Sequence, residues 1–261
     1  MTSGAGRVAL VTGAARGIGA ATVAALVARG YQVVAVDWCT DDPDLPYPMA
    51  MPAELAALAG PTVCTVQADV RDQAALAAAV EQAETAFGGL DVAVAAAGVI
   101  AGGVPQWELA PGAEQAVLDI DLGGVLNLAR VAVPALLRRE RPRQGRFIAI
   151  ASTAATRGLP MLAAYCAAKA GVGGLIRALG VELGDSGVTA NAVSPGSTDT
   201  PILAESARLY GLAGAAEFAA QQPFGRLLDP AEVAAVIAFL AGPESSGMTG
   251  AVVPVDGGLA L

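Results

Sequence analysis

Histidine is absent from all 261 residues of the chain. Its absence excludes every mechanism that uses an imidazole as the general base, the serine–histidine–aspartate triad among them, and every metal site with a histidine ligand. Acid–base chemistry near neutral pH would therefore have to come from tyrosine, lysine, aspartate, glutamate or cysteine side chains.

Cysteine is scarce, with Cys39, Cys64 and Cys166 as the only three. They form no C-x-x-C pair and no metal-ligand spacing, so we expect neither a disulfide framework nor a metal site. A sparse, odd number of cysteines is typical of a reducing compartment. We interpret all three as ordinary buried or half-buried thiols.

A basic cluster is also missing, and the net charge is −9. Nucleic acids and anionic membrane surfaces attract proteins of the opposite sign, so neither is expected as a partner. Although 54% of the residues are hydrophobic, no apolar run reaches the roughly 18–20 residues of a bilayer helix. Residues 1–6 are short and polar, unlike a signal peptide. These absences predict a cytoplasmic protein.

What the chain does contain is a regular alternation of short apolar, β-rich runs with long Ala/Leu-rich runs. Continuously apolar strands separated by helices indicate a parallel sheet that is covered on both faces. We predict one α/β domain over 1–261 with a doubly wound, Rossmann-type sheet of seven strands. The predicted strands are 8–12, 32–37, 62–69, 91–97, 146–152, 188–194 and 251–255, and the main helices end near 29 or cover 73–87, 112–139, 162–183 and 230–240.

Two stretches interrupt this alternation. Residues 38–52 contain four prolines and follow the second strand, where a ligand crevice would lie. Residues 200–228 separate the sixth strand from the next helix. Loops of this length in compact domains are usually functional or disordered, so both are candidate lids, with ordinary surface loops as the alternative.

A glycine-rich turn joins the first predicted strand to a helix. Gly13, Gly17 and Gly19 have the spacing G-x3-G-x-G, with Arg16 and Ile18 between them. Glycines allow the backbone to approach a pyrophosphate closely, and the helix N-terminus offers free N–H groups and partial positive charge. This arrangement predicts a dinucleotide site.

Two aspartates at strand ends bear on which dinucleotide binds. Asp37 ends the second strand, where a carboxylate can accept hydrogen bonds from ribose hydroxyls and would repel a 2′-phosphate. It therefore favours NAD over NADP, whereas Arg16 could serve a 2′-phosphate. Asp69 ends the third strand and could either contact the adenine amino group or cap the helix that begins near Gln73.

Tyr165 and Lys169 are four residues apart in a predicted helix and so share one face. A nearby ammonium favours the phenolate, which would lower the tyrosine pKa from about 10 toward the working range. Ser152, at the end of the fifth strand, could hold a substrate oxygen and stabilise charge that develops on it. The three predict proton transfer coupled to hydride transfer.

With these residues, the chain resembles the short-chain dehydrogenase/reductase family along essentially its full length. The resemblance implies the sheet order 3-2-1-4-5-6-7, a homotetramer built through helices near 112–139 and 162–183, Ser152 as the substrate-orienting residue, Tyr165 as acid/base, and Lys169 on the nicotinamide ribose. The matching segments are 12–19, Asp37, Asp69 with Val70, Ser152, Tyr165 with Lys169, 191–196 with Thr198 and Thr200, and 255–258. Pro195, Gly196, Thr198 and Thr200 would line the nicotinamide side.

Two positions depart from the family pattern. The family usually has Asn-Ala-Gly after the fourth strand, where this chain has Ala96, Ala97 and Gly98; the missing amide is expected to weaken a hydrogen bond across the sheet and to leave backbone contacts to the cofactor. The family's catalytic asparagine is replaced by Asp121. Asp121 would either keep that residue's role beside Lys169 or be an exposed helical residue.

The segment that begins Asp37-Trp38-Cys39 is similar to the insertion of mycofactocin-coupled short-chain dehydrogenases. That resemblance implies that NAD, covered by Trp38 and its neighbours, stays bound and is re-oxidised through a redox partner. The alternative is an ordinary loop in an enzyme that exchanges free NAD.

The expected activity is NAD-dependent interconversion of a hydrophobic secondary alcohol and its ketone, in a largely apolar pocket formed by 99–107, 156–162 and the 200–228 lid. A non-catalytic dinucleotide sensor or scaffold is a second possibility, because fold alone does not settle function. It has no need of Ser152, Tyr165 and Lys169 together. An NADP-dependent carbonyl reductase is the third, and Asp37 argues against it.

Overall fold

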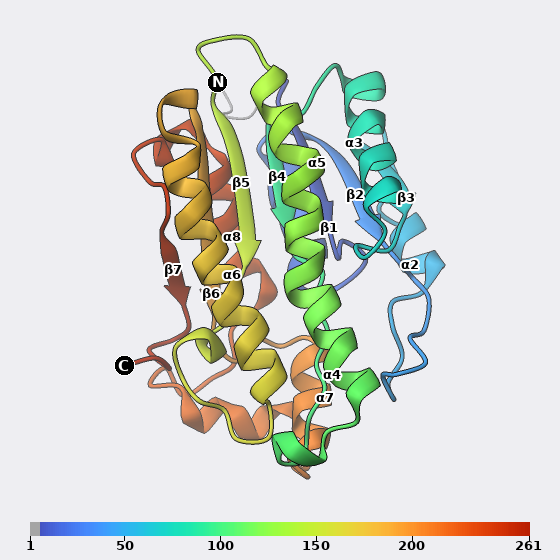
Figure 1. The fold of residues 1–261 in the computed structure, drawn as a ribbon, viewed down its shortest axis with the longest axis vertical. Helices are drawn as coiled ribbons and strands as arrows, with labels where there is room; N and C mark the ends of the chain where they lie inside the picture. Colours follow the sequence, from blue (N-terminus) through green and yellow to red (C-terminus); the bar gives the residue numbers. More distant parts are fainter. Residues whose placement is uncertain (1–5) are drawn as a thin grey trace.

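The computed structural model describes residues 6–261; the expectation for the first residues of the chain lies largely outside this range. All seven strands join one parallel sheet in the order β3-β2-β1-β4-β5-β6-β7, which confirms the predicted fold class and strand order (Figure 1). The strands are β1 (Val8–Thr12), β2 (Gln32–Asp37), β3 (Val63–Gln67), β4 (Val92–Ala95), β5 (Gly145–Ile150), β6 (Val188–Pro195) and β7 (Val252–Val255).

The central strands are buried on both faces because helices cover both. Helices α1 (Gly17–Ala28) and α8 (Pro230–Ala241) pack together against one face, while α3 (Gln73–Phe87), α5 (Gly124–Arg138) and α6 (Ala163–Glu182) cover the other (Figure 1). Each face has its own apolar core, since alternate side chains of a strand point to opposite sides. This explains why β1, β4 and β5 are continuously apolar rather than alternating.

Several strands are shorter at their carboxyl ends than predicted. Ala96 follows β4, Ser152 follows β5 and Asp69 follows β3, each within two residues of the last strand residue. At these positions the chain leaves the sheet and bends toward the cleft above the strand ends. The apolar pattern extends past the ladder because these residues are partly enclosed by neighbouring loops.

The predicted helix 112–139 is wound in three pieces. Helix α4 (Pro111–Leu118) leads into a π-helical turn, Asp119–Gly123, which leads into α5. A π-turn contains one residue more than the α-helical repeat and is frequent at functional sites. Here it contains Asp121.

This continuous helical segment is the one helix within residues 6–261 that meets the length and composition of a membrane span. Its 28 residues, 111–138, are long and apolar enough to cross a membrane by length and composition alone. Half of the 18-residue stretch that meets this test is buried in the fold. A core helix passes the same test when it packs its apolar stripe against a sheet, and α5 does so through Val125, Leu128 and Leu136.

The two stretches that interrupt the alternation both lie at the carboxyl edge of the sheet. Residues 38–51 form no regular helix or strand, and the short helix α2 (Pro52–Ala56), which the sequence did not predict, follows them. Tyr47 ties this segment down, because its hydroxyl accepts a hydrogen bond from Ile100 N at 2.9 Å. Residues 200–228 contain α7 (Pro201–Leu209) and a 3-10 segment, Ala215–Gln221.

Candidate active site

A cavity of about 590 Å³ opens above the carboxyl ends of the strands, where α/β sheets of this kind bind ligands. Every predicted site residue lines it except Asp121, which lies behind Lys169. The predicted residues on its wall are Gly13, Arg16, Gly17, Ile18, Gly19, Asp37, Trp38, Asp69, Val70, Ala96, Ala97, Gly98, Ser152, Tyr165, Lys169, Pro195, Gly196, Thr198 and Thr200.

The glycine turn at one end of the cavity packs against the end of β4 and leads into α1. Gly13 has φ +65°, and a Cβ there would lie 2.6 Å from the backbone of Ala97. Gly17, with φ +57°, begins α1, and no side chain caps this helix. The first N–H groups of α1 are therefore available to an anion, so the turn fits a dinucleotide pyrophosphate.

Asp37 closes the β2 side of this turn. Its Oδ2 accepts a hydrogen bond from Ala15 N at 2.9 Å, and the half-buried carboxylate still lines the cavity. Arg16 donates from Nη2 to the carbonyl of Pro48 at 3.0 Å, so its guanidinium is engaged by the 38–51 segment. This geometry fits a ribose at Asp37 better than a 2′-phosphate.

Asp69 does not cap the helix that follows it, so that interpretation is wrong, and the contact with adenine stays a prediction. The cap of α3 is Asp72, whose carboxylate accepts from Ala74 N at 2.8 Å and Ala75 N at 3.1 Å. Asp69 instead accepts from Arg71, whose Nε lies 2.8 Å from Oδ2. Its carboxylate therefore stays on the cavity wall.

Arg71 and Asp42 form a cluster here that the sequence analysis missed. The Arg71 guanidinium lies 2.7 Å from Asp69 and 2.7 Å from the buried Asp42, and 4.6 Å from the ring centroid of Trp38. The cluster fastens the 38–51 segment to the end of β3. Single charges far apart in sequence carry no spacing signal, so only the fold reveals this contact.

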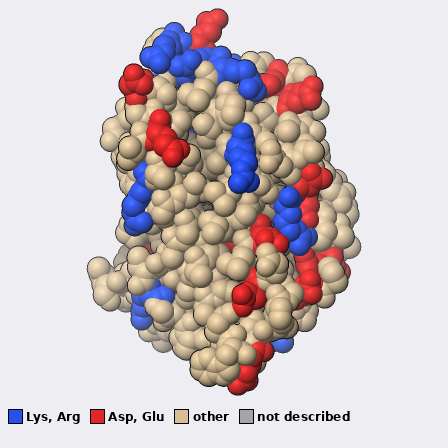
Figure 2. All heavy atoms as spheres, viewed as in Figure 1, with Lys and Arg blue, Asp and Glu red and all other residues tan. Residues whose placement is uncertain are grey.

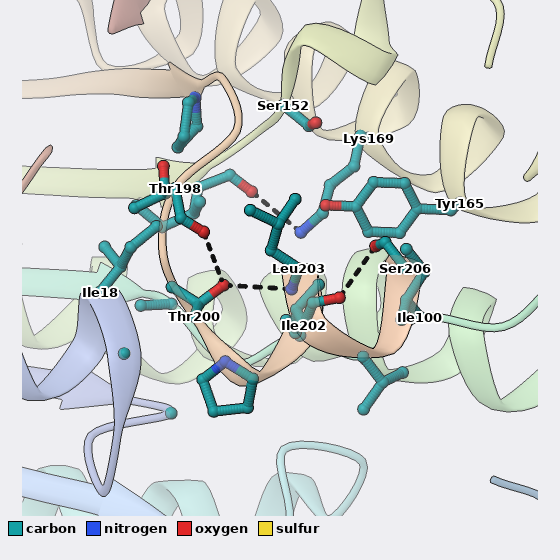
Figure 3. A pocket seen from close by; sticks show the side chains of 18 of the residues that line it. Ile18, Ile100, Ser152, Tyr165, Lys169, Thr198, Thr200, Ile202, Leu203 and Ser206 are labelled. Atoms are coloured by element: carbon teal, nitrogen blue, oxygen red, sulfur yellow. Dashed lines mark hydrogen bonds between the residues drawn. The ribbon is translucent and has the colours of Figure 1, made fainter. Parts of the chain in front are cut away.

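The residues that the sequence predicts for proton transfer lie together on the cavity wall. Lys169 and Tyr165 extend from α6 toward the space in front of α7, where Ser206 and Leu203 lie (Figure 3). Lys169 Nζ lies 5.5 Å from the centroid of the Tyr165 ring and donates to the carbonyl of Ile150 at 3.2 Å. The spacing of four residues thus brings both side chains to one face, as predicted.

The pKa of Tyr165 departs from the expected direction. Burial raises it above its ordinary value, and this effect exceeds the lowering by the Lys169 ammonium and by the hydrogen bond from Ser152. The expectation of a lowered pKa is therefore wrong. It considered the neighbouring charge and left out the desolvation of the ring hydroxyl.

Asp121 is fully buried, so the interpretation as an exposed helical residue is wrong. Its Oδ1 accepts a hydrogen bond from Val99 N at 2.7 Å, and its Oδ2 lies 3.0 Å from Lys169 Nζ. Burial lowers the pKa of Lys169, but the Asp121 carboxylate and Tyr165 raise it to a net value above normal. Asp121 therefore favours the ammonium form of Lys169, while burial also raises the pKa of the Asp121 carboxyl above its ordinary value.

Hydrogen bonds join the ends of β1 and β4 at the position where the asparagine amide is missing. Thr12, on the neighbouring β1, accepts hydrogen bonds through Oγ1 from Ala96 N at 3.2 Å and Ala97 N at 3.4 Å. The tie between these two strand ends therefore persists through backbone N–H groups.

On the far side of the cavity, Thr198 and Thr200 fix the start of α7. Thr200 Oγ1 donates to the carbonyl of Thr198 at 3.2 Å and accepts from Leu203 N at 3.3 Å (Figure 3). Thr200 therefore caps α7, a role that the sequence did not predict. It also faces the glycine turn, because a Cβ added at Gly17 would lie 3.4 Å from Thr200 Cγ2.

Comparison with known proteins extends over nearly the whole chain. Residues 13–260 match the family described as enoyl-(acyl carrier protein) reductase. The chain is 41% identical over 254 residues to cis-4-hydroxycyclohexanecarboxylate dehydrogenase of Sinomonas cyclohexanicum, covering 97% of this chain and 96% of that one. It is 32% identical over 276 residues to (−)-trans-carveol dehydrogenase of Rhodococcus erythropolis, covering 98% of each.

A solved structure agrees with this placement. Carveol dehydrogenase from Mycobacterium avium, crystallised in complex with NAD, has a TM-score of 0.92 and 32% identity over 99% of both chains. Matches of this extent and identity show that the chain belongs to the short-chain dehydrogenase/reductase family.

Proposed function

We propose that this protein is an NAD-dependent oxidoreductase that interconverts a secondary alcohol and its ketone. The observation that carries the proposal is one cavity with Ser152, Tyr165 and Lys169 at one end and the glycine turn with Asp37 at the other. The names of its relatives support it, since they are dehydrogenases of cyclic alcohols and one is crystallised with NAD. A sensor or scaffold would have no use for the catalytic end.

In this proposal, bound NAD would supply the hydride acceptor for oxidation of the alcohol carbon, and its reduced form the hydride donor for the reverse reaction. The residues at the catalytic end manage the substrate oxygen and its proton. Ser152 donates a hydrogen bond to the oxygen and holds it near Tyr165, which takes the proton during oxidation and returns it during reduction. Lys169, kept as an ammonium, stabilises the Tyr165 phenolate electrostatically.

Residues of the opposite end hold the cofactor. The N-terminus of α1 with Gly13 and Gly17 receives the pyrophosphate, and Asp37 accepts from the adenosine ribose hydroxyls. The backbone at Ala96 and Ala97 and the side chains of Thr198 and Thr200 border the nicotinamide side. The substrate enters over α7, whose apolar face borders the cavity.

The Tyr165→Phe variant tests the proposal. It should lose at least about a thousandfold in kcat for a secondary alcohol, because the proton acceptor is gone, while NAD binding measured by fluorescence titration stays unchanged. A matched Tyr210→Phe variant removes a hydroxyl that donates to the carbonyl of Pro160 at 2.7 Å and should retain most of the activity. Full activity in Tyr165→Phe would overturn the proposed mechanism.

The 38–51 segment supports a second part of the proposal, that bound NAD exchanges slowly and is re-oxidised through a redox partner, as in mycofactocin-coupled enzymes. The support is its attachment by Tyr47, by Arg16 and by the cluster of Asp42 with Arg71. Native mass spectrometry of purified protein should show NAD that survives gel filtration. Protein that emerges empty and turns over with added NAD would contradict retention.

We also propose that the chain is one cytoplasmic domain over 1–261 that assembles as a homotetramer through α5 and α6. The face over these helices carries few charged side chains (Figure 2), and Val181 on α6 is 82% exposed. Faces of that composition are common in subunit interfaces. Light scattering coupled to gel filtration should give four times the chain mass, and Val181→Glu should lower it.

A further inference from the structure

The charged groups on the cavity wall are divided unevenly between its two ends. The cofactor end holds both signs, and the catalytic centre holds the Lys169 ammonium, which Asp121 neutralises. On the substrate side one charged side chain remains among residues 6–261, that of Arg157. The charged residues on the wall are Arg16, Asp37, Asp42, Asp69, Arg157 and Lys169.

Arg157 is placed by the helical turn that follows Ser152. The turn begins at Thr153, and the N–H of Arg157 donates to the carbonyl of Thr153 at 2.9 Å. Arg157 follows shortly after the 3-10 turn Thr153–Ala155, and both Ser152 and Arg157 line the cavity. Ser152 and Arg157 therefore border the same cavity from one short segment of chain.

The guanidinium of Arg157 has no acidic partner within residues 6–261. It donates one hydrogen bond, from Nη1 to the carbonyl of Leu259, although a guanidinium has five N–H donors. Most of its donors are therefore free to bind a ligand. The arginines that do pair with a carboxylate are Arg71, Arg138, Arg139, Arg208 and Arg226.

Arg157 is exposed and forms no ion pair with an acid of residues 6–261. Leu159, Leu162, Leu212 and Phe218 line the same cavity. A ligand in this cavity would therefore meet one cationic side chain on a largely apolar substrate side. A neutral terpene or steroid alcohol would leave the guanidinium without a counter-ion.

We propose that Arg157 forms a carboxylate subsite, and that the substrate is an apolar secondary alcohol that also carries a carboxylate, remote from its hydroxyl group. A guanidinium binds a carboxylate through two parallel N–H donors, which would fix the far end of the substrate while Ser152 holds its hydroxyl. This inference rests on the proposed oxidoreductase function and narrows the expected hydrophobic alcohol to a carboxylated one.

Kinetics with a matched pair of alcohols tests the subsite. The probes are cis-4-hydroxycyclohexanecarboxylate and cis-4-methylcyclohexanol, which differ in the group opposite the hydroxyl. Arg157→Gln keeps a donor for the Leu259 carbonyl but removes the charge, and it should lower kcat/KM for the acid about 10- to 100-fold while that for the neutral alcohol changes less than about threefold.

Two further variants test whether the guanidinium geometry matters and whether the effect comes only from the net charge of the protein. Arg157→Lys keeps the positive charge but not the two parallel N–H donors of a guanidinium. Its kcat/KM for the acid should therefore lie between that of Arg157→Gln and that of the unaltered protein. Arg138→Gln removes an exposed arginine that pairs with Glu84 on α3, and kcat/KM for both substrates should stay unchanged. Equal losses in Arg138→Gln and Arg157→Gln would show a general charge effect and overturn the subsite.

A binding measurement keeps the inference testable without turnover. Cyclohexanecarboxylate and cyclohexanecarboxamide have no hydroxyl and cannot react, so calorimetric titration into NAD-loaded protein reports the subsite alone. Preference for the acid that disappears in Arg157→Gln supports the inference. Equal binding of acid and amide, or an acid affinity unchanged in Arg157→Gln, overturns it. If the subsite fails this test but neutral alcohols are still oxidised, the proposed function stands. If the acid binds but no alcohol is oxidised, the result counts against the proposed function alone.

Discussion

The Asp121 carboxylate lies 3.0 Å from Lys169 Nζ, with both side chains almost completely buried. Asp121 stands where the family pattern has an asparagine, and it adds a negative charge behind Lys169. A buried pair that loses one partner leaves an uncompensated charge, so the two residues depend on each other.

Asp121→Asn should move the pH profile of alcohol oxidation to lower pH. Oxidation needs Tyr165 deprotonated, so the rate rises as pH passes the tyrosine pKa. Burial raises that pKa and the Asp121 charge raises it further, so removing the charge lowers it and the rising limb begins earlier. The pKa of Lys169 also falls without Asp121, which moves loss of the ammonium to lower pH. The measurement is kcat against pH.

Asp119→Asn is the matched control for this shift. Asp119 lies two residues away in the same π-turn and accepts from the Gln115 side chain instead of Lys169. Its profile should match that of the unaltered protein. An unchanged profile in Asp121→Asn would show that the Asp121 charge is irrelevant, and unchanged rates in Asp121→Ala would remove its role altogether.

Asp37→Asn should relax the choice of cofactor. The amide keeps an acceptor oxygen for Ala15 N but loses the charge that repels a 2′-phosphate. We expect kcat/KM for NAD to fall about tenfold and that for NADP to rise by a similar factor, in line with the weight of a charged hydrogen bond. Steady-state kinetics with both cofactors checks this. A protein that prefers NADP before mutation would contradict the assignment of Asp37.

Gly13→Ala should destabilise the fold and weaken NAD binding together. The added Cβ would lie 2.6 Å from the Ala97 backbone, at a φ of +65° that disfavours a side chain. We expect a loss of about 1–3 kcal/mol in the free energy of unfolding, measured by urea denaturation. Gly247→Ala places its Cβ in open space at an exposed turn and should change the free energy by less than about 0.5 kcal/mol.

Asp42→Asn should speed the release of bound NAD. The change breaks the buried ion pair that fastens the 38–51 segment to Arg71, so the segment should open more often. We expect an off-rate increased about tenfold, followed by stopped-flow displacement of NADH. Glu84→Gln breaks the exposed pair with Arg138 and serves as the control. Identical off-rates in all three proteins would show that the segment does not hold the cofactor.

Where local signals are strong, the sequence predicted the first and last residues of the elements correctly. The bounds of β1, β2 and α3 agree with the expectation, and α3 begins after its Asp72 cap and ends at Gly88 in the left-handed conformation. Apolar pattern alone did not show where β4 and β5 leave the sheet, because residues just beyond a ladder are also enclosed.

Contacts between distant segments were beyond the sequence for a different reason. The resemblance singled out Asp121 as a departure but left two interpretations open, since burial and the distance to Lys169 depend on the π-turn and on how α6 packs. Arg71, Asp42 and Arg157 carried no motif at all. Their importance comes from which side chains surround them, and that is a property of the folded chain.

The π-turn Asp119–Gly123 also sets how this helix tolerates changes in length. One added or deleted residue in an α-helix rotates everything beyond it by about 100°. A turn that already contains one extra residue can return to the α-helical repeat and absorb a single deletion, at the cost of moving Asp121 away from Lys169. We therefore expect a one-residue deletion there to produce a folded but catalytically impaired protein, whereas the same deletion within α5 would turn its apolar stripe away from the sheet.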